Sequence, residues 1–356
     1  MKIERVDQLV AGYAKGDAIS QEARLFRDTF RKLGYKSDII VPSEYIAFGY
    51  ADDCRPLESF KTGKEHNVLI YHYSTASRAT NLFIKSPCKR IMRYHNITPS
   101  SYFKGFDDEA VLQLERGRRE LLSVAEAADS VWAVSAFNAM ELKNRDIRNI
   151  KIVPLLFGVD EFDISPDKET LDRFAGSLKN IVSLGRVVPN KCIEELIFGF
   201  AYYNRFINPY SRLILVGSER SCPRYYAMLR MLTERLDLQN VCLEGFLLNP
   251  QRSAIYQSAD LFVSTSRHEG YCLPLIEAMY HETPVMAREC GGMPEAMGGA
   301  GVLFDNAEPK TLAELMNRVL LSGSIRETIL DSQAVRLKEI QNRNIEKECR
   351  ELVLGS

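Results

Sequence analysis

The stretch LFVSTSRHEGYCLPLIEAMYHETPVMA, residues 261–287, decides the fold class. Its apolar start, LFVST, predicts a buried strand, and the polar segment SRHEGY predicts the loop that leaves this strand. Pro274 stands where a helix can begin, because a residue in the first turn needs no free N–H, and PLIEAMYH continues the helical pattern. A second apolar run, PVMA at 284–287, predicts the next strand. A strand, a helix and another strand in this order indicate an α/β unit with a parallel sheet.

The same alternation continues on both sides of this stretch. Apolar runs predict further strands at 68–73, 90–95, 130–135, 150–155, 180–185, 212–217 and 241–245. A chain of 356 residues is long for one hydrophobic core, so two doubly wound units are expected. We predict an N-terminal domain at 1–165, a C-terminal domain at 166–335 and a helix at 336–356 that packs on these lobes. The polar segment 158–172 is the expected crossing between the domains.

Composition narrows the classes of function. The chain has 46 basic and 47 acidic residues, so its net charge gives no reason to expect nucleic acid as a partner. No apolar stretch approaches the roughly 20 residues that cross a bilayer, and the start MKIERVDQLV lacks the apolar core of a signal peptide. A cytoplasmic protein is therefore expected. Its eight cysteines form no C-x-x-C pair, which favours reduced thiols and no metal site.

The loop at 266–271 is the first candidate site, because open α/β sheets bind ligands beyond the carboxyl ends of their strands. A helix starting near Pro274 would direct four backbone amides at an anion, those of Gly270, Tyr271, Cys272 and Leu273. Glu269 in the loop and Glu277 in the helix can face one cavity and accept hydrogen bonds from sugar hydroxyls. The alternative is that Glu277 is a solvated helix residue and Glu269 a partner of the helix dipole.

Two cations follow the strand predicted at 180–185. Arg186 and Lys191, in GRVVPNK, can clamp a diphosphate, although an exposed charged turn explains them too. Together with the helix start and the paired glutamates, they indicate a nucleoside diphosphate with hydroxyl-rich groups on either side. Gly291 and Gly292, in CGGMPE, fit either close packing against a ligand or a tight turn.

The N-terminal half offers weaker candidates. His95 ends a strand-like run in RYHNITP, where a lone histidine is more often structural than catalytic. Gly16 and Asp17 precede an amphipathic helix whose first amides could serve a ligand, and Asp17 could equally be only its N-cap.

Taken in order, GR…K, HEGYCLPLIEAM…TPV and CGGMPE resemble the retaining GT-B glycosyltransferases of glycosyltransferase family 4, with the E-x7-E signature at Glu269 and Glu277. The resemblance runs from about Ile181 to Phe304, and YHNITP and KIVPLLFGVD extend it into the N-terminal half. It implies two Rossmann-like lobes facing across a cleft, a nucleoside diphosphate sugar as the donor, and no cofactor. It also implies front-face attack, in which the departing phosphate accepts the acceptor's proton.

The resemblance also implies roles for individual residues. Arg186 and Lys191 would bind the donor diphosphate, and Glu277 would bind the ribose hydroxyls. Glu269 and the amides of 270–273 would hold the transferred sugar and the distal phosphate. The segment EGFL, with Phe246, would lie near the nucleobase, and His95 near the sugar and the acceptor. Two positions depart from the family pattern. Gly16 is followed by Asp17 where a second glycine is common, and Cys192 replaces the glycine that commonly follows the phosphate-binding lysine.

The hypothesis is therefore a metal-independent transfer of a hexose to a hydroxyl of a glycan or a lipid-linked acceptor, in bacterial surface polysaccharide or glycolipid synthesis, with GDP-mannose as the favoured donor. No D-x-D motif accompanies the site. An NAD-dependent oxidoreductase is one alternative, but the chain lacks G-x-G-x-x-G after an early strand. A non-catalytic nucleotide-sugar-binding protein is the other. The basic residues Lys85, Lys89, Arg90 and Arg93, with Arg116, Arg118 and Arg119, suggest peripheral contact with the inner face of a membrane, or else solvated helix faces.

Overall fold

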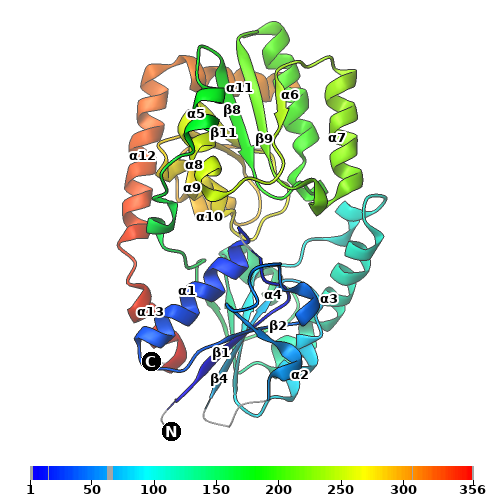
Figure 1. The fold of residues 1–356 in the computed structure, drawn as a ribbon, viewed down its shortest axis with the longest axis vertical. Helices are drawn as coiled ribbons and strands as arrows, with labels where there is room; N and C mark the ends of the chain where they lie inside the picture. Colours follow the sequence, from blue (N-terminus) through cyan, green and yellow to red (C-terminus); the bar gives the residue numbers. More distant parts are fainter. Residues whose placement is uncertain (1–2, 15, 62–66, 307, 355–356) are drawn as a thin grey trace. The chain divides into compact units, whose positions relative to one another are not determined.

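The computed structural model describes residues 3–14, 16–61, 67–306 and 308–354, and these residues form two compact units. Unit 1 comprises Met1–Ser100, Glu109–Gly158 and Arg343–Ser356, and unit 2 comprises Ser101–Asp108 and Val159–Asn342. The long segment of unit 2 thus begins just after Gly158, a few residues before the predicted boundary at 165/166. Figure 1 labels the helices and strands of both units.

Unit 1 is built on a sheet of seven parallel strands in the order β3-β2-β1-β4-β5-β6-β7. The strands are β1 Val6–Val10, β2 Ile39–Val41, β3 Arg55–Pro56, β4 Val68–Tyr73, β5 Lys89–Tyr94, β6 Ser130–Ala133 and β7 Ile150–Ile152. The helices are α1 Ala18–Lys32, α2 Ala79–Lys85, α3 Asp108–Ala127, α4 Ala136–Lys143 and α13 Ile345–Leu354. The order reverses at β1, as in other doubly wound sheets.

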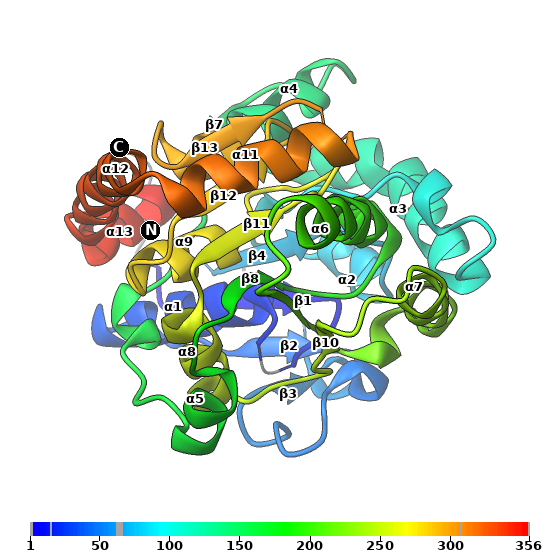
Figure 2. The same cartoon turned by 90° about the horizontal axis from the view of Figure 1, so that it is seen from above.

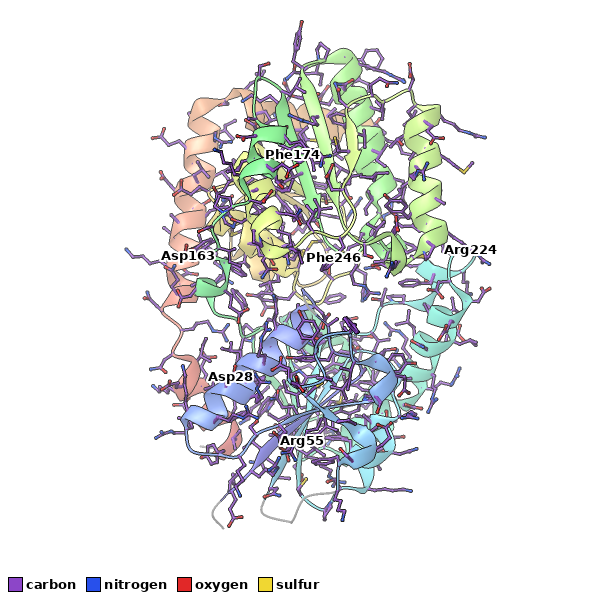
Figure 3. All side chains as sticks on the ribbon, in the orientation of Figure 1. Asp28, Arg55, Asp163, Phe174, Arg224 and Phe246 are labelled. Atoms are coloured by element: carbon purple, nitrogen blue, oxygen red, sulfur yellow. The ribbon has the colours of Figure 1, made fainter. Side chains whose placement is uncertain are left out.

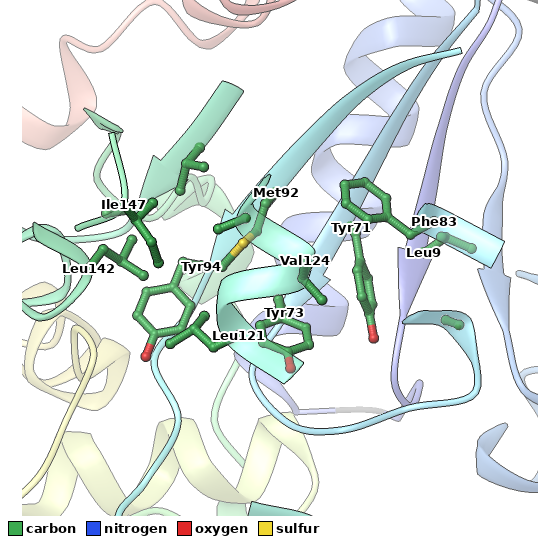
Figure 4. Packing of buried hydrophobic residues seen from close by; sticks show 14 of the residues in the cluster. Leu9, Tyr71, Tyr73, Phe83, Met92, Tyr94, Leu121, Val124, Leu142 and Ile147 are labelled. Carbon is green, nitrogen blue, oxygen red and sulfur yellow. The ribbon is translucent and has the colours of Figure 1, made fainter. Parts of the chain in front are cut away.

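Strand β4 shows how the sequence divides the core of unit 1. Tyr71 and Tyr73 face one side, where they pack with Phe83 of α2 and Leu121 of α3 (Figure 4). Ile70 faces the other side with Phe26 and Phe30 of α1, and Cys349 and Val353 of α13 join the same cluster. Successive side chains of a strand alternate between faces, so a fully buried strand needs apolar residues at every position unless a polar one has a partner. His72 is that exception in β4.

Unit 2 contains six parallel strands in the order β10-β9-β8-β11-β12-β13. The strands are β8 Lys179–Leu184, β9 Ser211–Val216, β10 Val241–Leu243, β11 Leu261–Ser264, β12 Val285–Arg288 and β13 Val302–Phe304. The helices are α5 Lys168–Phe174, α6 Ile193–Phe206, α7 Pro223–Arg235, α8 Asn249–Ser258, α9 Leu273–Tyr280, α10 Met293–Met297, α11 Pro309–Leu321 and α12 Gly323–Gln341. Helices lie on both sides of this sheet (Figure 2). The expected α/β architecture is confirmed in both units.

The tail differs from the single helix predicted at 336–356. Helix α12 ends at Gln341 within unit 2, and α13 belongs to unit 1, where it packs against α1. Asn344 explains the new start, because its side-chain oxygen accepts a hydrogen bond from the backbone N–H of Lys347 at 2.9 Å, as an N-cap does. Within the described ranges, none of the helices combines the length and apolar character needed to cross a membrane.

Candidate functional site

A pocket opens in unit 2 at the carboxyl ends of β8, β9 and β11. Its walls include Gly185, Arg186, Lys191, Ser266 and Cys272. The structure thus brings the two predicted cations together with the loop that leads into α9, because β8 and β11 are parallel neighbours whose ends meet at one edge.

Lys191 is the centre of the pocket's charge. It ends the short 3-10 turn Pro189–Lys191, and its Nζ forms an ion pair with a carboxylate oxygen of Glu269. Burial of Lys191 favours its neutral form, but the Glu269 carboxylate outweighs this effect and the pKa of Lys191 is raised. Ser266 donates its hydroxyl to the same oxygen of Glu269 at 3.0 Å. The lysine is therefore charged, and the glutamate is held in one orientation.

Arg186 differs from Lys191 in that it pairs with no carboxylate of the described residues. Its side chain is exposed, and it forms no ion pair with any residue in the described part of the chain. The charges of Lys191 and Glu269 cancel, so the three side chains of Arg186, Lys191 and Glu269 together carry one positive charge, that of Arg186. A group with a surplus cation beside free amides suits a phosphate oxygen.

The turn that carries Lys191 is tied to the strand end of β11. Thr265 donates its hydroxyl to the backbone carbonyls of Lys191 at 3.1 Å and Cys192 at 3.0 Å. Asn190 donates its amide to the carbonyl of His268 at 3.0 Å. Cys192, where the family pattern of the resemblance implies glycine, adopts the left-handed φ of 49° that glycine favours. The substitution keeps the turn, and burial raises the pKa of its thiol to about 12, so the side chain is neutral.

The start of α9 is a second anion-binding feature of this pocket. Cys272 is its N-cap with φ 77°, no side chain of the described residues caps the helix, and Pro274 occupies its first turn. The backbone N–H groups of Gly270, Cys272 and Leu273 donate to no other described group. Uncapped amides with a helix dipole behind them attract a negative charge.

Gly291 packs against the backbone of Glu269. A Cβ added to Gly291 would lie 2.3 Å from the carbonyl oxygen of Glu269, and Gly291 has a φ of 61°. Gly292 donates its N–H to the same carbonyl at 2.9 Å. The two glycines therefore hold the loop that carries Glu269. The close contact is with the protein's own backbone, so packing of the glycines against a ligand stays a prediction.

Glu277 is less accessible than the sequence suggested. Glu277 is only 6% exposed, and its carboxylate forms an ion pair with Arg252 of α8. Burial of Arg252 favours its neutral form, but Glu277 outweighs this effect and raises the pKa of the arginine. Sequence reasoning missed Arg252, which lies 25 positions away in a helical pattern that resembles a surface helix. Glu277 is thus neither a solvated residue nor an unpaired carboxylate.

Phe246 follows the edge strand β10 and is 58% exposed (Figure 3). The preceding residue, Gly245, accepts the backbone N–H of Gly217 at 2.8 Å, which anchors the segment beside the end of β9. The contact of Phe246 with a nucleobase stays a prediction.

His95 of unit 1 lies immediately after β5 and is part of a buried polar cluster. Its Nε2 is 2.9 Å from Nδ1 of His72, and the two rings stack with centroids 5.1 Å apart. Burial lowers the pKa of both imidazoles well below the ordinary value, and the neighbouring charge of Arg93 acts in the same direction. Both histidines are therefore neutral near pH 7.

The residues before α1 behave as a cap. Asp17 accepts hydrogen bonds from the backbone N–H of Ser20 at 2.9 Å and from its hydroxyl at 2.8 Å. Gly16 has a φ of 76°. The side chain of Asp17 is thus engaged in capping, and donor binding by Gly16 and Asp17 stays a prediction.

Glu22, His72 and His95 have the residue types of a metal site, with ligand atoms within 4.8 Å of one another. Their hydrogen bonds do not suit a cation, however. Arg93 donates to both oxygens of Glu22, at 3.0 and 2.6 Å, and the N–H of Leu156 adds a third bond at 2.8 Å. A metal ion would therefore stand beside a guanidinium. The expectation of a metal-free protein stays a prediction.

The position of Arg93 corrects the proposed basic membrane surface. Its side chain is completely buried because it pairs with Glu22 inside unit 1. Arg118 is also engaged, in an ion pair with Glu141. Arg93 therefore cannot serve as an exposed membrane contact, whereas membrane contact by the other basic residues stays a prediction.

Comparison with known proteins agrees with this geometry. Residues 178–322 match the family model described as glycosyl transferases group 1. The serotype-specific mannosyltransferase WbdA of Escherichia coli is 26% identical over 208 residues, which are 56% of this chain and 25% of WbdA. The mannosylfructose-phosphate synthase of Agrobacterium fabrum is 36% identical over 138 residues, which are 37% of this chain and 30% of that enzyme. The chain thus spans well under two thirds of these relatives.

Among solved structures, Anabaena HepE in complex with UDP-glucose superposes with a TM-score of 0.74 at 17% identity, covering 99% of this chain and 100% of HepE. At this identity the likeness concerns the fold alone. It extends over both units, whereas the family model covers only unit 2.

Proposed function

Because residues 178–322 form a domain of the glycosyl transferases group 1 family and the chain has the two-unit GT-B fold, we propose that the protein transfers a sugar from a nucleoside diphosphate to an acceptor hydroxyl. The observation that carries the proposal is the pocket at the ends of β8 and β11, where Arg186, Lys191 and the uncapped start of α9 converge. Such a group of donors binds a diphosphate, which is the leaving group of this reaction.

Negative charge grows on the diphosphate as its bond to the sugar breaks. Fixed donors that point at this charge lower the barrier, because they need no reorganisation during the reaction. Arg186 and Lys191 supply two cations, and the amides of Gly270, Cys272 and Leu273 supply dipoles. We assign the stabilisation of the leaving group to this set.

The two glutamates serve binding rather than nucleophilic attack in this proposal. Glu269 is neutralised by Lys191 and held by Ser266, which leaves its second oxygen to accept from a hydroxyl of the transferred sugar. Glu277, with one oxygen on Arg252, would accept from the ribose. Retention of the anomeric configuration would then follow from attack on the face that the diphosphate leaves, and His95 is the proposed contact of unit 1 with substrate.

Mannose is the sugar that we propose for the donor, since WbdA and the Agrobacterium enzyme are both named for mannosyl transfer. We propose a glycan or a lipid-linked sugar as the acceptor, a role in surface polysaccharide or glycolipid synthesis, and a cytoplasmic location. No cofactor is invoked, because the cations and amides of the pocket can hold the donor.

A panel of UDP-, GDP- and ADP-sugars tests the proposal, with release of the nucleoside diphosphate as the measurement. Release should occur with at least one donor, GDP-mannose first. Arg186→Ala should then lower kcat by about 100-fold or more, as the loss of one donor to a developing oxyanion does. Arg235→Ala, which removes an exposed arginine from the last turn of α7, is the matched control and should keep wild-type turnover. Tight binding of a nucleotide sugar without release would show a binding protein instead.

A further inference from the structure

The polar cluster around His95 includes Gln8, whose side chain is oriented by a hydrogen bond to the backbone of α1. Gln8 of β1 is completely buried, and its Nε2 donates to the carbonyl of Ala23 in α1 at 2.9 Å. This bond sets the orientation of the amide, since the reverse orientation would place two oxygens against each other. The Oε1 of Gln8 therefore faces Nε2 of His72, at 2.9 Å, and can only accept.

The tautomers of both histidines follow from this anchor. A neutral His72 must carry its proton on Nε2 to donate to Gln8, so its Nδ1 is an acceptor. The partner of this Nδ1 is Nε2 of His95, at 2.9 Å, which must therefore be the protonated nitrogen of that ring. The Oε2 of Glu22 lies 3.5 Å from Nε2 of His95 and 3.7 Å from Nδ1 of His72, so it is compatible with a proton between these two nitrogens, and the bond of His72 to Gln8 assigns that proton to Nε2 of His95. Nδ1 of His95 is then left with a lone pair.

That lone pair is available to a ligand. No group in the described ranges hydrogen bonds to Nδ1 of His95, and Nδ1 is not one of the enclosed side-chain atoms that lack a partner. It therefore reaches the surface of unit 1, at the carboxyl end of the sheet where ligands of such sheets bind.

We propose that Gln8 and His72 are positioning residues for His95: they hold its imidazole neutral with the proton on Nε2, so that Nδ1 accepts a hydrogen bond from a substrate hydroxyl. The inference deepens the proposed function and rests on it for the identity of the substrate. The role of His95 is that of an acceptor, which an imidazolium or the opposite tautomer could not fill. Burial and the guanidinium of Arg93 support it, because both disfavour a positive charge on His72 or His95 and together outweigh the opposite effect of the Glu22 carboxylate on His72.

The tautomer is measured directly by imidazole nitrogen NMR of the full chain labelled with 15N-histidine. The chain has only five histidines, so single substitutions assign the signals. His72 and His95 should each show a protonated Nε2 and a bare Nδ1 near pH 7, and adding Zn²⁺ should leave both unchanged. A protonated Nδ1 on His95, or a Zn²⁺-dependent shift of both rings, would overturn the proposal.

Kinetics test the consequence for substrate. His72→Phe keeps a ring but removes the hydrogen-bond acceptor of Nε2 of His95 and leaves only the more distant Glu22 carboxylate, so the tautomer of His95 should be held less strictly and kcat/KM should fall by roughly tenfold or more. His72→Asn places an amide oxygen near the position of Nδ1 and should restore both the tautomer and most of the activity. Tyr71→Phe is the control, since it removes a buried hydrogen bond, that to Thr80, from the opposite face of β4. It should change the melting temperature but not kcat/KM.

Two failures can be told apart. If no donor is turned over by the wild type, the proposed function fails, while the NMR experiment still decides the tautomer. If the wild type is active and His72→Phe keeps its kcat/KM, positioning by His72 is refuted.

Discussion

The contact between Gly291 and the backbone of Glu269 permits a test of the donor site that leaves its side chains untouched. In Gly291→Ala the new Cβ would meet the Glu269 carbonyl oxygen at 2.3 Å and its nitrogen at 3.0 Å. Ordinary contact distances require about 1 Å more, and both atoms belong to the backbone, so no side chain can rotate away. Either the Gly291 turn or the Glu269 loop must move.

The movement is transmitted to the pocket by bonds already described. Displacing the turn breaks the hydrogen bond from Gly292 to Glu269, and displacing the loop shifts the carboxylate away from Lys191. A misplacement of about 1 Å in a reacting geometry can cost about 100-fold in rate. We therefore expect kcat/KM for the donor to fall by roughly this factor.

Gly299→Ala provides the matched control. Gly299 has a φ of 86°, so alanine is strained there as it is at Gly291, where φ is 61°, but no atom of the described residues lies within 4 Å of the added Cβ. Each substitution should lower the free energy of unfolding by about 1–2 kcal/mol through backbone strain alone. Only Gly291→Ala should also weaken donor binding in calorimetry. Equal kcat/KM values for the two variants, within about threefold, would refute the transmission from Gly291 to the pocket.

Three further outcomes are expected. Arg252→Met should raise KM for the donor and lower the free energy of unfolding by about 1–3 kcal/mol, because it leaves the Glu277 carboxylate buried without its cation. Arg252→Lys should retain part of the donor affinity and part of the stability. Unchanged binding of the donor by Arg252→Met would contradict this pairing. Cys192→Val should destabilise the protein by about 1–3 kcal/mol and reduce activity, because a β-branched side chain is strained at φ 49°. Cys192→Gly should stay near wild type in denaturant unfolding. If Cys192→Gly were less stable than Cys192→Val, strain would be excluded as the cause. Burial lowers the pKa of both His72 and His95, so below about pH 6.5 the unfolded chain binds protons that the folded chain does not. The free energy of unfolding should then fall by up to about 1.4 kcal/mol per histidine for each pH unit, until the folded pKa is reached. Urea unfolding from neutral to acidic pH should show this fall, with a smaller slope in His72→Asn.

The parts of the site that could be predicted from sequence are those that depend on local patterns. A strand followed by a polar loop and a proline places amides at one edge of a parallel sheet, and a second strand followed by Arg186 and Lys191 must end at the same edge. The predicted strands at 180–185 and 261–265 therefore located the pocket without knowledge of which helices cover it.

The partners of the charged groups could not be predicted in this way. Glu22 and Arg93 are 71 positions apart, and Glu22 stands in a helical pattern where a single charge is normally solvated. Arg93 did carry a signal, since it lies between Met92 and Tyr94 in a strand with no exposed residue at that end. A charged residue inside a buried strand needs a buried partner, and this argues against a membrane role for it from the outset. Which residue is the partner depends on the packing of α1 against the sheet.

The ion pairs of unit 2 also explain how two glutamates can serve an anionic donor. An unpaired carboxylate near a diphosphate would repel it. Lys191 neutralises Glu269 and Arg252 neutralises Glu277, so each glutamate keeps an oxygen that can accept a hydroxyl without adding net negative charge. The charge of Arg186, which has no such carboxylate among the described residues, then acts on the diphosphate alone. Arg252 and Lys191 thus convert two repulsive carboxylates into acceptors for hydroxyl groups. Removing either cation alone should therefore weaken donor binding more than removing that cation together with its glutamate.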